Sequence, residues 1–361
     1  MKTDMRFLIL SIAILLSSLG AAAEKYEAVF DKYSATIHYN ALTLPGDAVF
    51  VRVSLSTKDK YLKDSPVKTS GRIQIFSGTA DGFDSGKKAG KDLGHTDFYQ
   101  VAMSDGTEAQ SISDRKTLRK IRKMPKSETV LAGIPLSSYF KTGDYTLLVT
   151  LNPFGGKQDE IALPLKVNEK EFVKETIQLD ARNTSIKTND SDERWKQIKK
   201  LNGILETRQA DGVYDLGPYE APTPATRRTS FFADRRTYAY TNGKSSTSLH
   251  YGIDYGIKEG SEVRACAAGK VVMAETRIST GWSTVIEHLP GLYSLYYHQK
   301  ELKVKVGDIV QKGDLIGYSG MTGLATGPHL HWEMRLNMEA VSPDFFLGDF
   351  TFEKAQESRQ N

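Results

Sequence analysis

The chain has 361 residues, 39% of them hydrophobic and 25% charged, and its formal net charge at pH 7 is +4. This length predicts two domains, each long enough to bury its own core, and the composition is typical of a soluble globular protein. So weak a charge gives no reason to expect a nucleic-acid partner. Cys266 is the only cysteine, so an internal disulfide is excluded, and we expect a small buried side chain at a strand end.

The first residues have the pattern of a signal peptide. Lys2 and Arg6 precede a mostly apolar stretch of 13 residues, 7–19, and the small residues 21–23 follow it. The stretch is shorter than the ~20 apolar residues of a spanning helix. We therefore expect cleavage before Glu24, export to the periplasm or cell envelope, and no stable membrane insertion afterwards; an uncleaved anchor is the alternative.

Residues 24–175 read as β-structure. Turn clusters separate short runs rich in β-branched and aromatic residues: Ser34–His38, Ala48–Leu55, Gly71–Phe76, Thr129–Ile134 and Tyr145–Leu151. This pattern predicts a β-sandwich of immunoglobulin-like architecture, without the Cys and Trp markers of that fold. Residues 115–126 include seven basic side chains, which we interpret as a solvated face rather than a patch for an anionic envelope polymer.

A helix is predicted over residues 190–208, with Asp190 as its cap. Its apolar residues fall on one face: Trp195, Ile198, Leu201 and Leu205. A proline-rich linker follows at residues 218–224. The predicted division is a signal peptide (1–23), a β-sandwich (24–175), a helical connector and linker (176–225), a C-terminal domain (226–350) and a polar tail (351–361).

Five of the seven histidines lie between positions 250 and 331. His329 and His331 are two residues apart, so a strand would point both to one face. His250 and Asp254 are also evenly spaced, and the nearby glycines favour an extended segment over a helix. His298 ends a run between the two pairs. Imidazole with carboxylate is a ligand set typical of catalytic zinc, in which a fourth position stays open for water.

The segments between these residues predict an antiparallel meander. Glycine-containing turns separate Glu262–Cys266, Lys270–Thr276, Trp282–His288 and Leu292–His298, and two further turn-and-strand units follow around 306–310 and 312–317. Either pair alone, His250 with Asp254 or His329 with His331, is a weak signal for a metal site. The two pairs, the further histidine and the β scaffold together are a stronger one.

The segment 230–346 resembles the lysostaphin-type (LytM-like, duplicated hybrid motif) zinc metallopeptidases of bacterial cell walls. The resemblance is carried by "HYGIDYG", "GKVVMA", "TVIEH", "GLYSLYYH", "VKVGDIVQKGDLIGYSGMTGLATGPHLHWE" and "VSPDFF". Upstream, "SFFADRR" looks like a further family motif in which glycine usually stands at Ala233, a departure that we expect to lie off the metal site.

The resemblance implies a C-terminal antiparallel β peptidase domain with a zinc groove. It assigns one zinc ion to His250, Asp254 and His331, and catalytic roles to His298 and His329. His288 matches a position without a ligand role. Because the helical H-E-x-x-H motif and its glutamate base are missing, a histidine would take the proton from water. Glu333 would orient a ligand or form a strand-end salt bridge.

We therefore expect a zinc-dependent endopeptidase that hydrolyses peptide cross-links of peptidoglycan by metal-activated water. The resemblance leaves the bond open, since relatives cut D-alanyl to diaminopimelate links or glycine bridges. One alternative is a non-catalytic, cell-wall-binding activator of another hydrolase. Another places the activity in the N-terminal sandwich, as an adhesion or carbohydrate-binding module.

Overall fold

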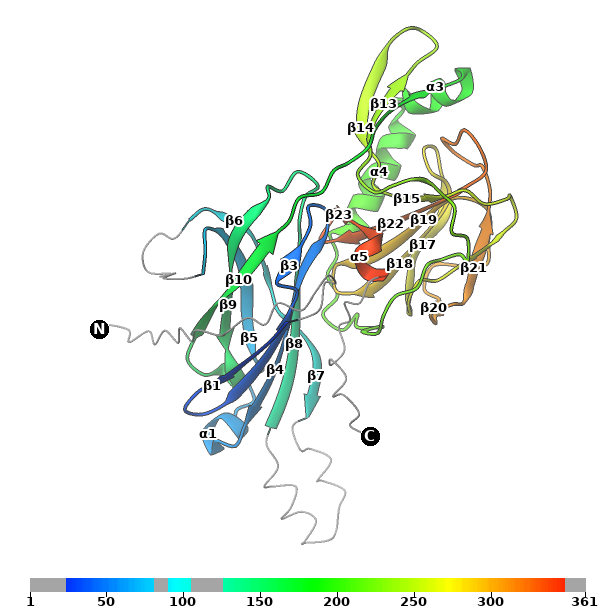
Figure 1. The fold of residues 1–361 in the computed structure, drawn as a ribbon. Coiled ribbons are helices and arrows are strands. Elements are labelled where there is room, and N and C mark those ends of the chain that lie inside the picture. Colours follow the sequence, from blue (N-terminus) through cyan, green and yellow to red (C-terminus); the bar gives the residue numbers. More distant parts are fainter. Residues whose placement is uncertain (1–23, 81–89, 105–125, 348–361) are drawn as a thin grey trace, which may run out of the picture. The chain divides into compact units, whose positions relative to one another are not determined.

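The computed structural model describes residues 24–80, 90–104 and 126–347, and strands dominate it (Figure 1), which confirms the mainly β class. The predicted signal peptide, the polar tail and residues 115–125 of the basic run lie outside these ranges. Two compact units are present. The first comprises residues 1–43, 49–134 and 141–168, and the second comprises 44–48, 135–140 and 169–361.

The first unit contains two five-stranded sheets. One sheet has the order β1 (Glu24–Val29), β2 (Ser34–Tyr39), β4 (Ala48–Thr57), β8 (Lys126–Pro135) and β7 (Tyr99–Ser104). The other has the order β3 (Leu42–Thr43), β10 (Asp159–Val167), β9 (Gly143–Asn152), β5 (Ser70–Ser77) and β6 (Asp92–Asp97). The short helices are α1 (Lys60–Lys63) and η2 (Pro153–Gly155).

Both sheets contribute apolar side chains to the core of this unit. Fully buried examples come from four strands: Ile37, Val53, Ile73 and Val149. Along β10, buried and more exposed residues alternate, as the two faces of a strand require. All five strands predicted in this region lie within observed strands. The immunoglobulin-like detail of the connections stays a prediction.

The second unit contains a small and a large sheet. The small sheet has the order β11 (Lys174–Gln178), β13 (Arg235–Ala239) and β14 (Ser245–Leu249). The path of the ten-stranded sheet is β12 (Arg228–Ser230), β15 (Gly252–Tyr255), β22 (Leu330–Leu336), β19 (Leu292–Leu302), β18 (Gly281–Leu289), β17 (Gly269–Arg277) and β20 (Ile309–Val310). Its remaining strands are β16 (Glu262–Arg264), β21 (Leu315–Ser319) and β23 (Glu339–Val341), and helix α5 (Pro343–Leu347) follows.

The large sheet is antiparallel throughout, as the glycine turns predicted, but the predicted meander is wrong at its first strand, because β16 pairs with β21 and not with β17. Consecutive strands β17, β18 and β19 pair as hairpins. The sheet then brings β22 between β19 and β15, two strands that are distant in sequence. This long-range pairing gathers the C-terminal histidines.

Helices α3 (Ala181–Lys187) and α4 (Asp192–Leu205) belong to the second unit, although we predicted a separate connector there. The predicted cap of α4 is wrong by one residue, because the Ser191 hydroxyl accepts the bond from the Arg194 amide. Asp190 instead accepts from the Trp195 indole. Trp195 is 57% exposed, so it does not share the buried face that we predicted for it.

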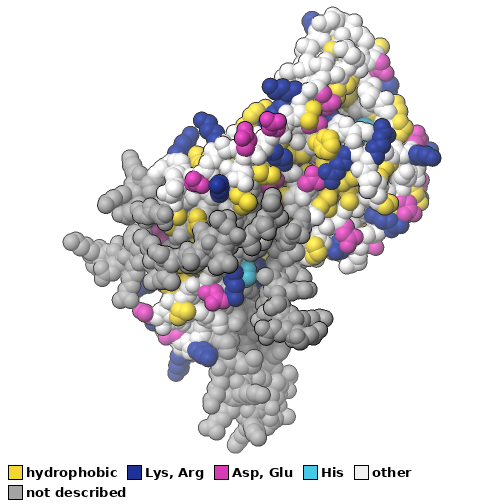
Figure 2. Space-filling model, in the orientation of Figure 1, with side chains coloured by type: hydrophobic (Ala, Val, Ile, Leu, Met, Phe, Trp, Pro, Cys, Tyr) yellow, Lys and Arg dark blue, Asp and Glu magenta, His cyan; other side chains and the backbone are white. Residues whose placement is uncertain are grey.

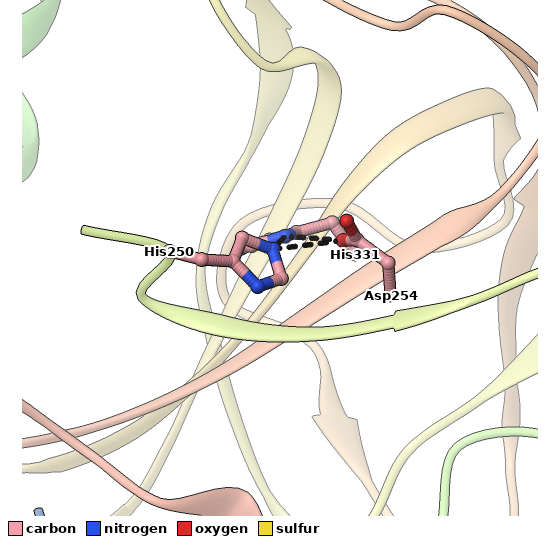
Figure 3. A group of neighbouring side chains, drawn as sticks. All are labelled: His250, Asp254 and His331. Carbon is pink, nitrogen blue, oxygen red and sulfur yellow. Dashed lines mark hydrogen bonds and ion pairs between the residues drawn. The ribbon is translucent and has the colours of Figure 1, made fainter. Parts of the chain in front are cut away.

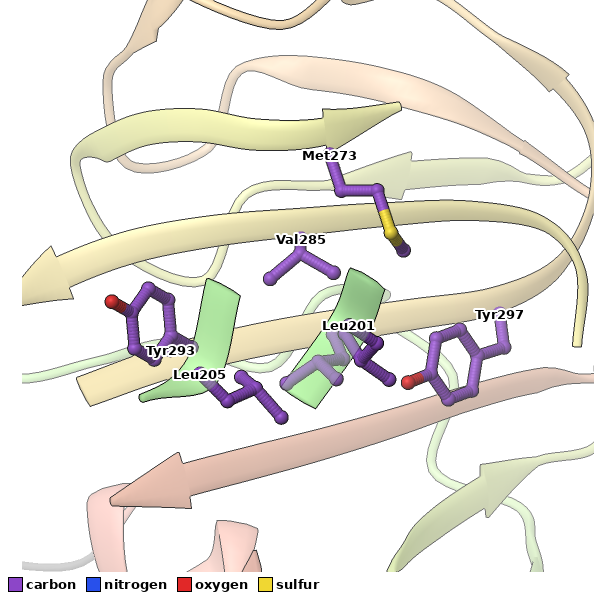
Figure 4. Packing of buried hydrophobic residues seen from close by; sticks show 7 residues of the cluster. Leu201, Leu205, Met273, Val285, Tyr293 and Tyr297 are labelled. Carbon is purple, nitrogen blue, oxygen red and sulfur yellow. The ribbon is translucent and has the colours of Figure 1, made fainter. Parts of the chain in front are cut away.

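The buried face of α4 is built around two leucines. Leu201 and Leu205 lie against the large sheet (Figure 4), in a cluster with Met273, Val285, Tyr293, Leu295 and Tyr297. Because Tyr297 directly precedes His298 on β19, this packing also supports the strand that carries a candidate site residue.

Replacing Leu205 with alanine is expected to lower the free energy of unfolding of the second unit by about 2–5 kcal/mol, since it empties space in a closed cluster. Lys199→Ala, at an exposed position of α4, should change it by less than about 0.5 kcal/mol. Urea titration followed by tryptophan fluorescence measures both, because all three tryptophans belong to the second unit. Equal effects of the two substitutions would contradict the packing.

Acidic and basic side chains are interspersed on the face that Figure 2 shows, as expected from the weak net charge. Within the described ranges, the chain has no helix with the length and apolar character needed to cross a membrane.

Candidate metal centre

Three side chains from separate segments meet at one point in the second unit. His250 follows β14, Asp254 lies in β15 and His331 lies in β22, and the pairing of β15 with β22 sets Asp254 opposite His331. His250 Nε2 is 3.0 Å from Asp254 Oδ1 and 2.9 Å from His331 Nδ1, and that Nδ1 is 2.8 Å from the same oxygen (Figure 3). All three residues are buried, with exposed fractions of 3%, 6% and 7% in chain order.

In the His250 and His331 rings, the nitrogen that points away from the other two side chains shows which tautomer is present. His250 Nδ1 is 2.8 Å from the Phe231 carbonyl, and His331 Nε2 is 2.9 Å from Glu333 Oε1. The carbonyl and the carboxylate can only accept hydrogen bonds, so His250 Nδ1 and His331 Nε2 each carry a proton and donate it to these oxygens. In the neutral tautomers, two ring lone pairs and a carboxylate oxygen then face one another, and only a proton or a cation between them relieves their repulsion.

This donor set fits a divalent metal ion. Two imidazoles and one carboxylate make up a typical catalytic zinc set with one position left for water. Ligand atoms at about 2.0–2.1 Å from one tetrahedral ion lie roughly 3.3 Å apart, so the three observed atoms need to separate by only a few tenths of an ångström. Among the described residues, this is the one group of histidine, cysteine and acidic side chains close enough to share an ion.

Two further histidines flank these ligand atoms. His298 and His329 have ring centroids 4.6 Å apart, and the His298 ring lies 6.1 Å from that of His331. His298 Nδ1 donates to the Thr322 carbonyl at 2.7 Å, and His329 Nδ1 donates to the Gly327 carbonyl at 2.8 Å. Each neutral ring therefore keeps Nε2 free to accept a proton; His329 Nε2 is 3.8 Å from Asp254 Oδ1.

His298 owes its position to an irregularity in β19. The pairing of β18 with β19 shifts register between Trp282 and Thr284, opposite this residue, and His298 has a left-handed backbone with φ of 60°. A bulge of this kind re-aims a side chain out of the regular alternation. Such a conformation is costly for a residue with a Cβ, and it is found preferentially at functional positions.

The pKa values of these groups differ with their partners. Burial lowers the pKa of His298 to about 3, and His329 and His331 act in the same direction. Burial also disfavours the charged form of His331, but hydrogen bonds to Asp254 and Glu333 raise its pKa to about 9. In the metal-free protein, a proton on His331 Nδ1 therefore occupies the point where the ligand atoms meet.

Glu333 contacts the outer nitrogen of His331, as a residue that orients a ligand would, and it also forms a salt bridge with Arg335, the other role that we predicted for it. Its second oxygen accepts from Arg335 Nε at 2.8 Å, so the carboxylate is fixed from both sides. Burial alone would raise the pKa of Glu333, but Arg335 and His331 lower it to about 2. An ionised Glu333 polarises the ring, which would make the lone pair of His331 Nδ1 a stronger donor to a metal ion.

Ala233 lies closer to the site than we expected. It has a left-handed backbone with φ of 64°, a conformation that favours glycine, the residue that the resemblance implied at this position. Its amide donates to the His250 carbonyl at 2.7 Å, and the His250 amide donates to the Asp234 carbonyl at 3.0 Å. The departure from glycine thus lies beside His250, one of the three converging side chains, and the left-handed preference of glycine was the signal that could have shown it.

The remaining histidines lie away from this group. His288 is fully buried in the second unit, with Nδ1 2.8 Å from the Ala268 carbonyl and Nε2 2.7 Å from Ser294 Oγ. Cys266 lies beside it, and burial raises the pKa of its thiol to about 12. Neither belongs to the converging group, and a structural role stays our prediction for both. His38 and His95 belong to the first unit.

Comparison with known proteins places the site in a family. The family model described as Peptidase family M23 matches residues 248–343. The DD-carboxypeptidase/endopeptidase Mpg of Neisseria meningitidis serogroup B is 40% identical over 95 residues, which are 26% of this chain and 22% of Mpg. Lysostaphin of Staphylococcus simulans is 39% identical over 98 residues, 25% of this chain and 18% of that protein.

The chain spans about a fifth of the length of these curated relatives. Among solved structures, the catalytic domain of lysostaphin from Staphylococcus simulans is 31% identical with a TM-score of 0.27, over 37% of this chain and 92% of that one. The matched segment contains the three converging side chains and both flanking histidines. Residues 248–343 of this chain therefore form a Peptidase family M23 domain.

Proposed function

We propose that the protein is a zinc-dependent endopeptidase that hydrolyses peptide cross-links of peptidoglycan. The observation that supports it most is the convergence of His250, Asp254 and His331 within 3.0 Å of one another, with two more histidines beside them. His250, Asp254 and His331 would hold one Zn²⁺. His298 and His329 would be the catalytic residues.

Zinc in such a site supplies Lewis acidity, which polarises a carbonyl and lowers the pKa of a coordinated water from 15.7 to about 7. His298 and His329 supply the proton transfers. In the neutral ring of each, Nδ1 donates to a backbone carbonyl and Nε2 is the accepting nitrogen, so each can accept a proton from water and later return it to the leaving amine. A protonated ring can also donate to the oxyanion of a tetrahedral intermediate.

The names of the relatives support a cell-wall substrate but point to two kinds of bond. Mpg is called a DD-carboxypeptidase/endopeptidase, whereas ALE-1 of Staphylococcus capitis is called a glycyl-glycine endopeptidase. We propose peptidoglycan stems and cross-links as the partner, in the periplasm or cell envelope, and leave the bond to experiment. The predicted signal peptide agrees with that location.

Digestion of purified sacculi tests this function directly. The full protein loaded with zinc should release muropeptides whose masses identify the bond that is cut. A chelator should stop the release, and added zinc should restore it. Zinc-loaded protein that binds sacculi without changing any muropeptide would overturn the proposal and favour the non-catalytic activator.

Zinc affinity is expected to rise about tenfold per pH unit between pH 6 and 8. Because the pKa of His331 is raised to about 9, this ring is protonated over that range, and zinc must displace one proton to bind. The gain should end near pH 9, where the metal-free ring is already neutral. Competition titrations at several pH values measure the slope, and calorimetry in two buffers counts the proton. A flat profile would contradict the proton on His331.

A further inference from the structure

The second oxygen of Asp254 is held by an arginine outside the matched segment. Arg236 Nη2 donates to Asp254 Oδ2 at 3.0 Å, and Arg236 Nε donates to Glu175 Oε1 at 2.6 Å. We propose that Arg236, held by Glu175, is a positioning residue that presents Asp254 to the metal through one oxygen only. This inference rests on the metal centre proposed above.

The small sheet sets Glu175 beside Arg236, and Arg236 in turn reaches Asp254 in the large sheet. Strand β11 pairs in parallel with β13, with Glu175 beside Arg236. Because side chains alternate along a strand, the adjacent arginines of β13 point to opposite faces. Arg235 donates to Ser138 Oγ and to the Ser138 carbonyl, each at 2.9 Å, whereas Arg236 reaches the metal ligand.

Burial of the charged Arg236 side chain is costly unless that charge is paired. The Arg236 and Asp254 side chains are 10% and 8% exposed, while that of Glu175 is 31% exposed. A buried guanidinium needs both charge and hydrogen-bond partners. Glu175 supplies the second carboxylate, so the Glu175–Arg236 pair is neutral and adds little net positive charge beside the site.

The consequence for the metal follows from the two carboxylate oxygens. A free aspartate can bind an ion through one oxygen or through both. With Oδ2 engaged by Arg236, only Oδ1 faces His250 and His331, and a coordination position is preserved for water. Without Arg236, the carboxylate can rotate, and its orientation is no longer fixed before the ion binds.

Zinc affinity is the direct readout. Loss of a group that orients a ligand typically costs 10–100-fold in metal affinity, and we expect Arg236→Met to weaken zinc binding by that factor. Arg236→Lys keeps the charge but cannot form both directed bonds, so it should recover only part of the loss. Glu175→Gln should give a smaller loss. Arg235→Met removes the same charge one residue away and should leave the affinity unchanged.

The visible absorption spectrum of bound cobalt(II) provides a second readout, which would not change if the role of Arg236 were only structural. This absorption weakens when coordination number rises, so the Arg236→Met protein should show a weaker band if Asp254 binds through both oxygens. Glu175→Gln in the Arg236→Met background should have no further effect on zinc affinity, because Glu175 acts through Arg236.

The outcomes separate this inference from the proposed function. If the parent binds zinc and Arg236→Met, Arg236→Lys and Glu175→Gln all bind it within twofold of the parent, the positioning role is overturned and the metal centre stands. If the parent binds no zinc, both are overturned. Should Arg236→Met fail to fold, Arg236→Lys and the partly exposed Glu175→Gln decide the question in the full chain.

Discussion

Replacing His331 with alanine is expected to remove bound zinc and to lower the rate of peptidoglycan cleavage by roughly 10³-fold or more. A coordinated metal ion supplies several kcal/mol of transition-state stabilisation, and about 4 kcal/mol corresponds to roughly 10³ in rate. His331 is engaged at both ring nitrogens, which face His250, Asp254 and Glu333. Its loss leaves one imidazole and one carboxylate, too few to hold an ion firmly.

Metal analysis of the purified variant and mass spectrometry of digested sacculi measure the two parts of this prediction. His95→Ala is the matched control, because His95 is a histidine of the first unit whose side chain is 53% exposed. The control should keep one zinc per chain and full activity. A His331→Ala protein that retains zinc would show that the ion binds elsewhere, and one that loses zinc but still cuts would show that cleavage does not depend on this site.

Much of this site could be predicted from local patterns. The spacing of His329 and His331 indicated a shared strand face, and the glycine turns placed β17, β18 and β19 of the meander correctly because turn chemistry is local. Local patterns could not give the pairing of β15 with β22, which joins Asp254 to a residue 77 positions away. That pairing depends on the order of strands in the whole sheet.

Three further features could not be predicted from the sequence, for other physical reasons. The contact of Arg236 with Asp254 joins a strand of the small sheet to a strand of the large sheet, and nothing in the spacing of charges indicates which carboxylate an arginine will reach. The left-handed backbone of His298 depends on a register shift in β19, which the sequence does not mark with glycine. Asp190 and Ser191 are both good helix caps, and only the structure shows which side chain accepts the amide.

Alanine at His298 or at His329 is expected to lower kcat by about 10²–10⁴-fold while zinc stays bound. Neither residue belongs to the converging ligand group, and each holds its ring through a backbone carbonyl. Metal content therefore separates these two histidines from His331. A variant that loses zinc along with activity would instead have removed a ligand.

The pH profile sharpens the assignment of the base. Burial, with His329 and His331 nearby, lowers the pKa of His298 to about 3, so this ring is neutral and able to accept a proton throughout pH 5–8. If His298 is the base, the acid side of the kcat/KM profile should not fall at the ordinary histidine pKa near 6.5. His298→Gln should then lose activity at every pH by a similar factor. Activity within tenfold of the parent in both single variants and in the double variant would show that neither histidine transfers the proton.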